Sequence, residues 1–129
     1  MRAIDTNVIV RYLVADDPDQ AKRARTLIDH QDVFVCTTVI LETEWVLRSV
    51  YGFPATQCTQ ALTDVAGLLQ VTLEEAIAVA QALRWVTQGM DFADGLHLAK
   101  AQGCEAFVSF DVAFTKAAST HSIVKVRAA

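Results

Sequence analysis

Two aspartates follow segments that are predicted to be β-strands. Residues 2–5 form the first segment, which ends at Asp5, and Asp111 comes directly after residues 106–110, "AFVSF". In open parallel sheets, ligands bind in the crevice beyond the carboxyl ends of the strands. A buried carboxylate is unfavourable unless a partner pairs with it or a ligand binds it. We therefore expect these two carboxylates to converge on a bound ligand.

Three further carboxylates fit the same site. Glu42 lies among apolar neighbours in a predicted helix, whereas a solvated glutamate is expected among polar ones. Asp91 and Asp94 are three residues apart, so they share one face of the helix that Asp91 begins. Oxygen-only clusters suit hard divalent cations, magnesium or manganese, which keep water and substrate phosphates as their other ligands. The predicted chemistry is hydrolysis of a phosphodiester by metal-activated water.

Each of these carboxylates also has a purely structural interpretation. Asp5, Asp91 and Asp111 each precede a predicted helix and can cap its first turn. Asp94, one turn into a helix, is favoured by the positive end of the helix dipole. Glu42 can be a solvated residue at a helix edge. Spacing alone leaves the structural and the metal-binding interpretations open.

The elements that must position these side chains alternate between strand and helix. Besides the two strands above, short strands are expected at residues 33–36, 70–72 and 122–126. Amphipathic or apolar helices are expected at residues 7–13, 19–30, 39–52, 55–69, 73–88, 92–102 and 112–119. This order predicts an α/β fold, an α/β/α sandwich with a mainly parallel central sheet and helices on both faces.

Several helix starts carry local signals. Pro18 suits the first turn of its helix, and either Thr37 or Thr38 can cap the next one. Thr72 and Glu75 have the T-x-x-E spacing of a capping box, which predicts a helix start at that point.

Length, composition and charge limit the classes of protein to which this sequence can belong. The 129 residues, 53% of them apolar, predict a single domain over residues 1–129. A net charge of −4 and a pI of about 5.2 argue against a general nucleic-acid coat protein. We expect no membrane span, no signal peptide and a cytoplasmic location. The three cysteines are far apart and odd in number, so we interpret them as buried thiols.

The order of these motifs resembles that of PIN-domain nucleases over essentially the whole chain. "IDTNVIVRYL" resembles the first motif of that family, and "TTVILETEWVL" resembles the second. "DFADGLHLAKAQGCEAFVSFDVAF" is similar to the third and fourth motifs. Within the family, the chain looks most like the VapC-type toxins of bacterial toxin–antitoxin pairs.

The resemblance implies a PIN-like fold and a magnesium- or manganese-dependent endoribonuclease. It also implies a homodimer that acts on RNA and is inhibited by a small antitoxin protein. The acidic pocket that it implies consists of Asp5, Glu42, Asp94 and Asp111. Residues that it implies to support the pocket are Thr6 and Asn7, which orient Asp5 or bind near it, and Ser109, the small hydroxyl residue before the fourth acid.

Two positions depart from the family pattern. Asp91 has no fixed counterpart across PIN domains, although "DFAD" is common in the toxin subgroup, so Asp91 is an additional candidate ligand. Gly95 stands where the subgroup often has alanine, and a glycine inside a helix costs about 1 kcal/mol relative to alanine.

Other residues near the motifs have less specific interpretations. His97 follows Asp94 by three residues, and we expect it in the core or supporting the site rather than in catalysis. Trp45 and Trp85 are expected in the core or at an interface. Four cations could form a phosphate-contacting rim or be ordinary solvated charges: Arg11, Arg48, Lys100 and Lys116.

Two other classes of function remain open from the sequence. A phosphatase of the haloacid dehalogenase class would need a second aspartate two positions after Asp5, where this chain has Asn7. A non-catalytic, receiver-like or PIN-derived binding module would keep the acidic pocket for structure or regulation, with Lys116 as a weak match to a receiver lysine. The sequence identifies neither the RNA target, nor the antitoxin, nor whether one or two metal ions bind.

Overall fold

The computed structural model describes residues 1–121 and 124–129. Its elements follow in the order β1 (Arg2–Ala3), α1 (Thr6–Leu13), α2 (Pro18–His30), β2 (Val33–Val35), α3 (Thr37–Ser49), α4 (Ala55–Ala66), β3 (Val71–Leu73), α5 (Ala76–Val86), α6 (Phe92–Lys100), β4 (Phe107–Ser109), α7 (Val112–His121) and β5 (Val126–Ala128). All paired strands are parallel, so the chain has the α/β class that the sequence predicts. It forms two compact units, Met1–Ala76 and Ile77–Ala129.

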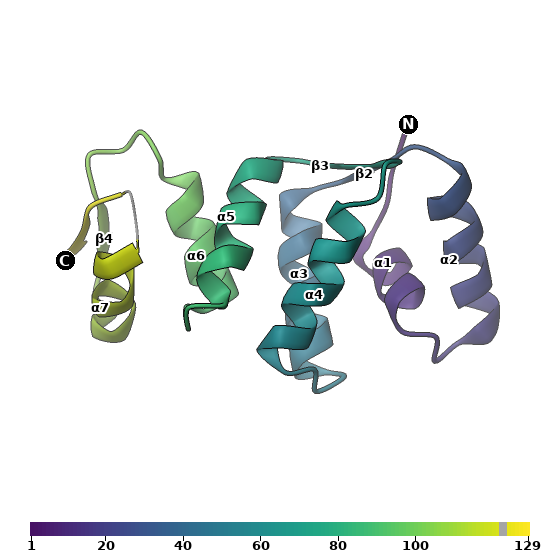
Figure 1. Ribbon diagram of the computed structural model, residues 1–129, viewed down its shortest axis with the longest axis horizontal. Helices are drawn as coiled ribbons and strands as arrows, with labels where there is room; N and C mark the ends of the chain where they lie inside the picture. Colours follow the sequence, from purple (N-terminus) through teal and green to yellow (C-terminus); the bar gives the residue numbers. More distant parts are fainter. Residues whose placement is uncertain (122–123) are drawn as a thin grey trace. The chain divides into compact units, whose positions relative to one another are not determined.

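The first unit has a three-stranded parallel sheet in the order β1-β2-β3. Val33 of β2 pairs with Arg2 on one side and with Val71 on the other. Helix α1 packs against α2 and α3, and α3 packs against α4, as Figure 1 shows. Large side chains that are fully buried in this core are Ile9, Ile28, Ile40, Leu47 and Leu62.

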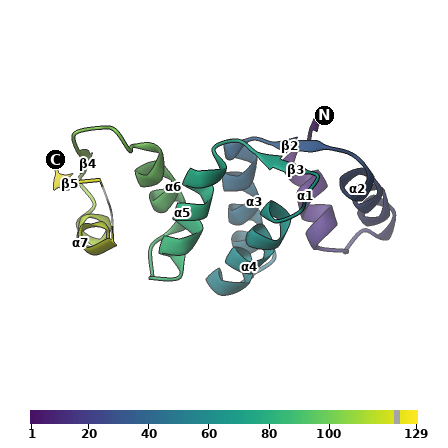
Figure 2. The same cartoon turned by 45° about the horizontal axis from the view of Figure 1, so that its top comes forward.

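The second unit has a two-stranded parallel sheet, β4-β5, against which α7 packs (Figure 2). The rings of Phe107 and Phe114 meet edge to face, with centroids 5.4 Å apart. An apolar cluster joins α5, α6 and α7, and Phe107 and Val126 of this sheet pack against it. Its buried members are Trp85, Met90, Leu98, Ala99, Phe114, Ala118 and Val124. The prediction that Trp85 belongs to the core is therefore confirmed.

The strands form two sheets, one in each unit, where the sequence predicts one central sheet. Whether residues 1–129 form the single domain that the composition predicts therefore stays a prediction. Across residues 1–121 and 124–129, no helix combines the length and the apolar character that crossing a membrane requires.

The start of α3 differs from the prediction. Neither Thr37 nor Thr38 is the N-cap, because Cys36 occupies that position and its side chain makes no capping bond. Instead, Oε1 of Glu74 accepts hydrogen bonds from the backbone N of Thr37 (2.9 Å) and from its Oγ1 (2.8 Å). A residue distant in the sequence thus satisfies a backbone donor at the helix start, where four N–H groups have no partner inside the helix.

The predicted T-x-x-E capping box is wrong. Thr72 lies within β3 and pairs with Phe34 of β2, so it is extended rather than at a helix start. Helix α5 begins only at Ala76. Glu75 has φ of 51°, which is in the left-handed region, and this turn separates the strand from the helix.

Two further predictions need correction. The last strand was expected at residues 122–126, but β5 spans Val126–Ala128, and residues 122–123 lie outside the described part. The strand is displaced because Phe107, Val108 and Ser109 of β4 pair with residues 126–128. Of the three free cysteines, Cys58 is buried as expected, Cys36 is half-buried and Cys104 is exposed.

Candidate metal centre

Asp5 lies just beyond β1 and begins α1. Its backbone is extended (φ −89°, ψ 167°), and its Oδ1 accepts a hydrogen bond from the backbone N of Thr6 at 2.8 Å. The structural interpretation of Asp5 as a helix cap is therefore confirmed. The cap uses one of two carboxylate oxygens, and the side chain is exposed. A capping role and a metal-binding role are thus compatible in the same residue.

Thr6 brings Glu42 of α3 to the start of α1. The buried hydroxyl of Thr6 donates a hydrogen bond to Oε1 of Glu42. Glu42 itself is exposed, although its neighbours on either side of the helix are apolar. Thr6 therefore hydrogen-bonds to two of the predicted ligands, Asp5 and Glu42. We call these two carboxylates the Asp5–Glu42 pair.

In the second unit, Asp91 and Asp94 lie at the start of α6. Asp91 is the N-cap, and its Oδ2 accepts from the backbone N of Asp94 at 3.2 Å. Asp94 is half-buried. Burial raises the pKa of Asp94, and the negative charges of Asp91 and Asp111 raise it further, while His97 lowers it. The charges of Asp91 and Asp111 thus both act on Asp94, and we call these three residues the Asp94 group.

Asp111 follows β4 and caps α7. Its Oδ1 accepts from the backbone N of Phe114 at 2.9 Å. Oγ of Ser109, the last residue of β4, accepts from the backbone N of Asp111 at 3.0 Å. Both bonds fix the turn between strand and helix, so Ser109 supports Asp111 as the resemblance implies.

His97 and Gly95 lie on the same helix as Asp94. His97 is exposed, so it is not a core histidine, and its influence on the pKa of Asp94 places it beside the Asp94 group. Gly95 is buried, and a Cβ built there would lie 3.5 Å from atoms of Ala82, an ordinary contact. Space alone therefore does not require glycine at this position.

Two arginines proposed for a phosphate-contacting rim are already held within the chain. Nε of Arg11 donates to Gln20, and its Nη1 donates to Tyr51 and Asp16. Arg48 pairs with the buried Glu44 at 3.1 Å. These bonds give both arginines structural roles.

The remaining rim candidates, Lys100 and Lys116, are exposed. Trp45 is 54% exposed on α3, which excludes it from the core of its own unit.

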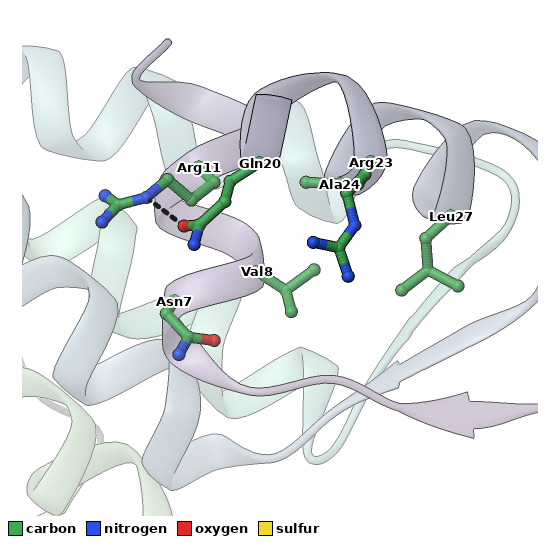
Figure 3. Close-up of a pocket in the computed structure, with 7 residues that line it drawn as sticks. All are labelled: Asn7, Val8, Arg11, Gln20, Arg23, Ala24 and Leu27. Carbon is green, nitrogen blue, oxygen red and sulfur yellow. Dashed lines mark hydrogen bonds between the residues drawn. The ribbon is translucent and has the colours of Figure 1, made fainter. Parts of the chain in front are cut away.

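Asn7, the predicted supporting residue, is exposed and lines a cavity between α1 and α2 (Figure 3). Gln20 and Arg23 line the same cavity, and sequence reasoning missed them. The basic run "KRAR" at residues 22–25 was a signal for Arg23 but not for Gln20, and the sequence does not reveal which helix faces that run.

The donor set fits a hard divalent cation. Within the described parts of the chain, no three His, Cys, Asp or Glu side chains form a group that could hold a metal ion. The candidate ligands nevertheless offer only carboxylate oxygens, which magnesium and manganese prefer over the thiolates and imidazoles of softer sites. The residues brought together in each unit are therefore chemically suited to such an ion.

The family model of the PIN domain matches residues 3–119. This chain belongs to the PIN-domain family. PIN domains are generally nucleases, so the match favours a nuclease over the phosphatase alternative. Parallel strands alternating with helices agree with the α/β fold of a PIN domain. A search of curated proteins finds no match to the chain.

Proposed function

We propose that this PIN-domain protein is a metal-dependent endoribonuclease and the toxin of a type II toxin–antitoxin pair. The observation that carries the proposal is the contact of Asp5 and Glu42 through Thr6, in a chain of a nuclease family. Asp5 at the start of α1 and Glu42 on α3 thus both accept hydrogen bonds from Thr6. Carboxylate oxygens are the ligands that a divalent cation of a nuclease would use.

Magnesium or manganese would be held by Asp5, Glu42, Asp94 and Asp111, with Asp91 as an additional candidate ligand. A bound ion would supply Lewis-acid chemistry there, lowering the pKa of a water and offsetting negative charge on the phosphodiester. The chain's own residues position these ligands: the Thr6 hydroxyl donates a hydrogen bond to Glu42, and Oγ of Ser109 accepts one from the backbone N of Asp111.

Protonation of Asp94 competes with metal binding. Burial and two neighbouring carboxylates raise the pKa of Asp94, so this group retains a proton at higher pH than an ordinary aspartate does. Metal ligands must be deprotonated, and metal affinity is therefore pH-dependent. We expect activity to increase as the pH rises through the range in which Asp94 ionises.

The toxin assignment rests on the resemblance to VapC-type proteins. In that arrangement a small antitoxin binds the nuclease with an amphipathic helix. A lysine or arginine of the antitoxin would neutralise the carboxylates and block access of RNA. The acidic residues would then serve both as metal ligands and as the target of inhibition.

We further propose a homodimer that forms through a helical face. Trp45 and Val50 are 54% and 64% exposed at α3 and its C-terminal end, and large exposed apolar side chains favour an interface. Light scattering of the purified protein should give twice the 14.1 kDa mass of the chain. A monodisperse monomer at micromolar concentration would contradict the dimer, and Trp45→Glu should convert a dimer into a monomer.

The nuclease proposal is tested with purified protein and unpaired RNA. Internal cleavage should occur with magnesium or manganese, stop in excess chelator, and return when manganese is added in excess of the chelator. Undiminished cleavage in chelator would contradict the metal mechanism. Hydrolysis of a small phosphate ester without RNA cleavage would instead favour a phosphatase, and the absence of both activities would favour a non-catalytic module.

A further inference from the structure

Helices α1 and α2 form an open cavity of about 310 Å³ (Figure 3). Its apolar surface comes from Val8 on α1 and from Ala24 and Leu27 on α2. Ligand pockets typically measure about 300 to 1,000 Å³, so this one has room for a single small group. An apolar surface of this kind can contact the flat face of a nucleobase or a ribose.

The cavity is braced from within the chain. Arg11 of α1 donates from Nε to Oε1 of Gln20 on α2 at 2.8 Å, and from Nη1 to Oη of Tyr51 at 3.1 Å. Oη of Tyr51 in turn donates to Asp16, in the turn between the two helices, at 2.8 Å. These bonds tie α1, α2 and the segment after α3 together, so the cavity is formed before any ligand binds.

The same bonds orient the amide of Gln20. Arginine can only donate hydrogen bonds, so the amide oxygen of Gln20 must face Arg11 and the NH₂ group must point elsewhere. Figure 3 shows that nitrogen on the far side of the amide from Arg11. Asn7 presents a second side-chain amide to the cavity. Two amides can donate to and accept from the edge of a base.

Arg23 supplies a positive charge at the cavity. Its guanidinium extends from α2 toward Val8 in Figure 3. It pairs with Asp19 at 3.8 Å, and these side chains are 77% and 82% exposed. Ion pairs this long and this exposed contribute little, so Arg23 can exchange Asp19 for a phosphate. Guanidinium binds phosphate through two parallel hydrogen bonds.

The geometry points to a nucleotide subsite: the α1–α2 cavity binds one unpaired nucleotide of the RNA substrate. Arg23 contacts a phosphate, the amides of Asn7 and Gln20 contact the base edge, and the apolar surface contacts the base or ribose. Asn7 lies in the first turn of α1, the helix that Asp5 caps, so the subsite and Asp5 of the Asp5–Glu42 pair share this helix. Proteins recognise single-stranded RNA through such splayed-out bases. The inference rests on the proposed ribonuclease function.

The test is binding of a fluorescein-labelled oligouridylate to the full chain, followed by fluorescence anisotropy in excess chelator. Arg23→Ala should weaken binding several-fold and reduce the slope of log affinity against log salt concentration by about 0.7, the value for one phosphate contact on a single strand. Arg25→Ala is the matched control. Arg25 is on the same helix but does not line the cavity, and its charge acts on the pKa of Tyr12. Arg25→Ala should leave the slope unchanged.

Equal effects of Arg23→Ala and Arg25→Ala, or no effect of either, would overturn the subsite. Wild-type RNA binding by Arg23→Ala would also overturn it, whatever the effect of Arg25→Ala. The assay requires no cleavage, so the two proposals can fail separately. Arg23-dependent binding without cleavage would support the subsite and contradict the nuclease, and cleavage with Arg23-independent binding would do the reverse.

Discussion

Asp5→Asn and Asp94→Asn should each reduce metal-dependent RNA cleavage about 100-fold or more while the protein stays folded. Loss of a group that only orients a metal ligand typically costs about 10- to 100-fold, and loss of a ligand itself should cost more. Asparagine is close to aspartate in size and also caps helices, so the start of α1 should remain intact. Initial rates with manganese, alongside circular dichroism of each variant, measure the effect.

Asp17→Asn is the matched control for a cap without metal chemistry. Asp17 caps α2 by accepting from the backbone N of Gln20 at 3.1 Å, as Asp5 caps α1, and it contacts neither acidic group. Its substitution should leave the cleavage rate unchanged. Wild-type cleavage by either Asp5→Asn or Asp94→Asn would show that the carboxylate concerned is not a ligand.

Loss of the hydrogen bond from Thr6 to Glu42 should reduce cleavage less than loss of a metal ligand does. Thr6→Val removes the donor to Glu42 but retains the shape of the side chain, and it should lower cleavage by about 10- to 100-fold. Thr6→Ser keeps the hydroxyl and should restore most of the rate. If valine and serine behave alike, the hydrogen bond to Glu42 does not contribute to activity.

Without metal, Asp94→Asn should stabilise the protein at neutral pH. The raised pKa means that folded Asp94 holds its proton at pH values where the unfolded chain has lost it. The native state then binds more protons than the unfolded state, so the free energy of unfolding falls as the pH rises from the ordinary value of 3.8 through the folded pKa. Asparagine does not ionise and avoids this loss.

Chemical denaturation in chelator measures this effect as the difference between Asp94→Asn and wild type at each pH. The difference should shift in favour of Asp94→Asn between about pH 3 and neutrality. Asp64→Asn, at an exposed site on α4 outside the Asp94 group, should show no such trend. A pH-independent difference for Asp94→Asn would mean that neither burial nor the neighbouring carboxylates raise the pKa of Asp94.

Bound metal should make the wild type more stable than Asp94→Asn, the reverse of the order expected without metal. A divalent ion that binds only the folded state stabilises it by about 2.7 kcal/mol at a hundred times its dissociation constant. Wild type should gain this stability at neutral pH, whereas Asp94→Asn should gain little. A wild-type melting temperature that does not respond to magnesium or manganese would argue against a metal site.

Local chemistry predicted the caps and turns on which the candidate site is built. Asp91 caps α6, and Asp111 follows β4, as expected, because both depend on residues within one turn of each other. The T-x-x-E pattern at Thr72 predicted a helix start wrongly, because pairing of β3 with β2 keeps Thr72 extended. A local signal thus fails where strand pairing competes with it.

Contacts between distant residues were not predictable. The sequence places Thr6 beside Asp5 but does not show that its hydroxyl reaches Glu42. Likewise, nothing near Thr37 identifies Glu74 as the acceptor at the start of α3. Both depend on how whole helices pack, which periodicity describes only as a buried face.

Under the proposed function, Asp5 and Asp94 are both ligands of the divalent ion that cleavage requires. Binding of manganese, followed by the electron paramagnetic resonance signal of the free ion at neutral pH, tests this without requiring cleavage. We expect Asp5→Asn and Asp94→Asn each to abolish or strongly weaken the tightest binding event of the wild type, while Asp17→Asn retains it. Wild-type affinity and stoichiometry in either Asp5→Asn or Asp94→Asn would show that the carboxylate concerned does not bind the ion.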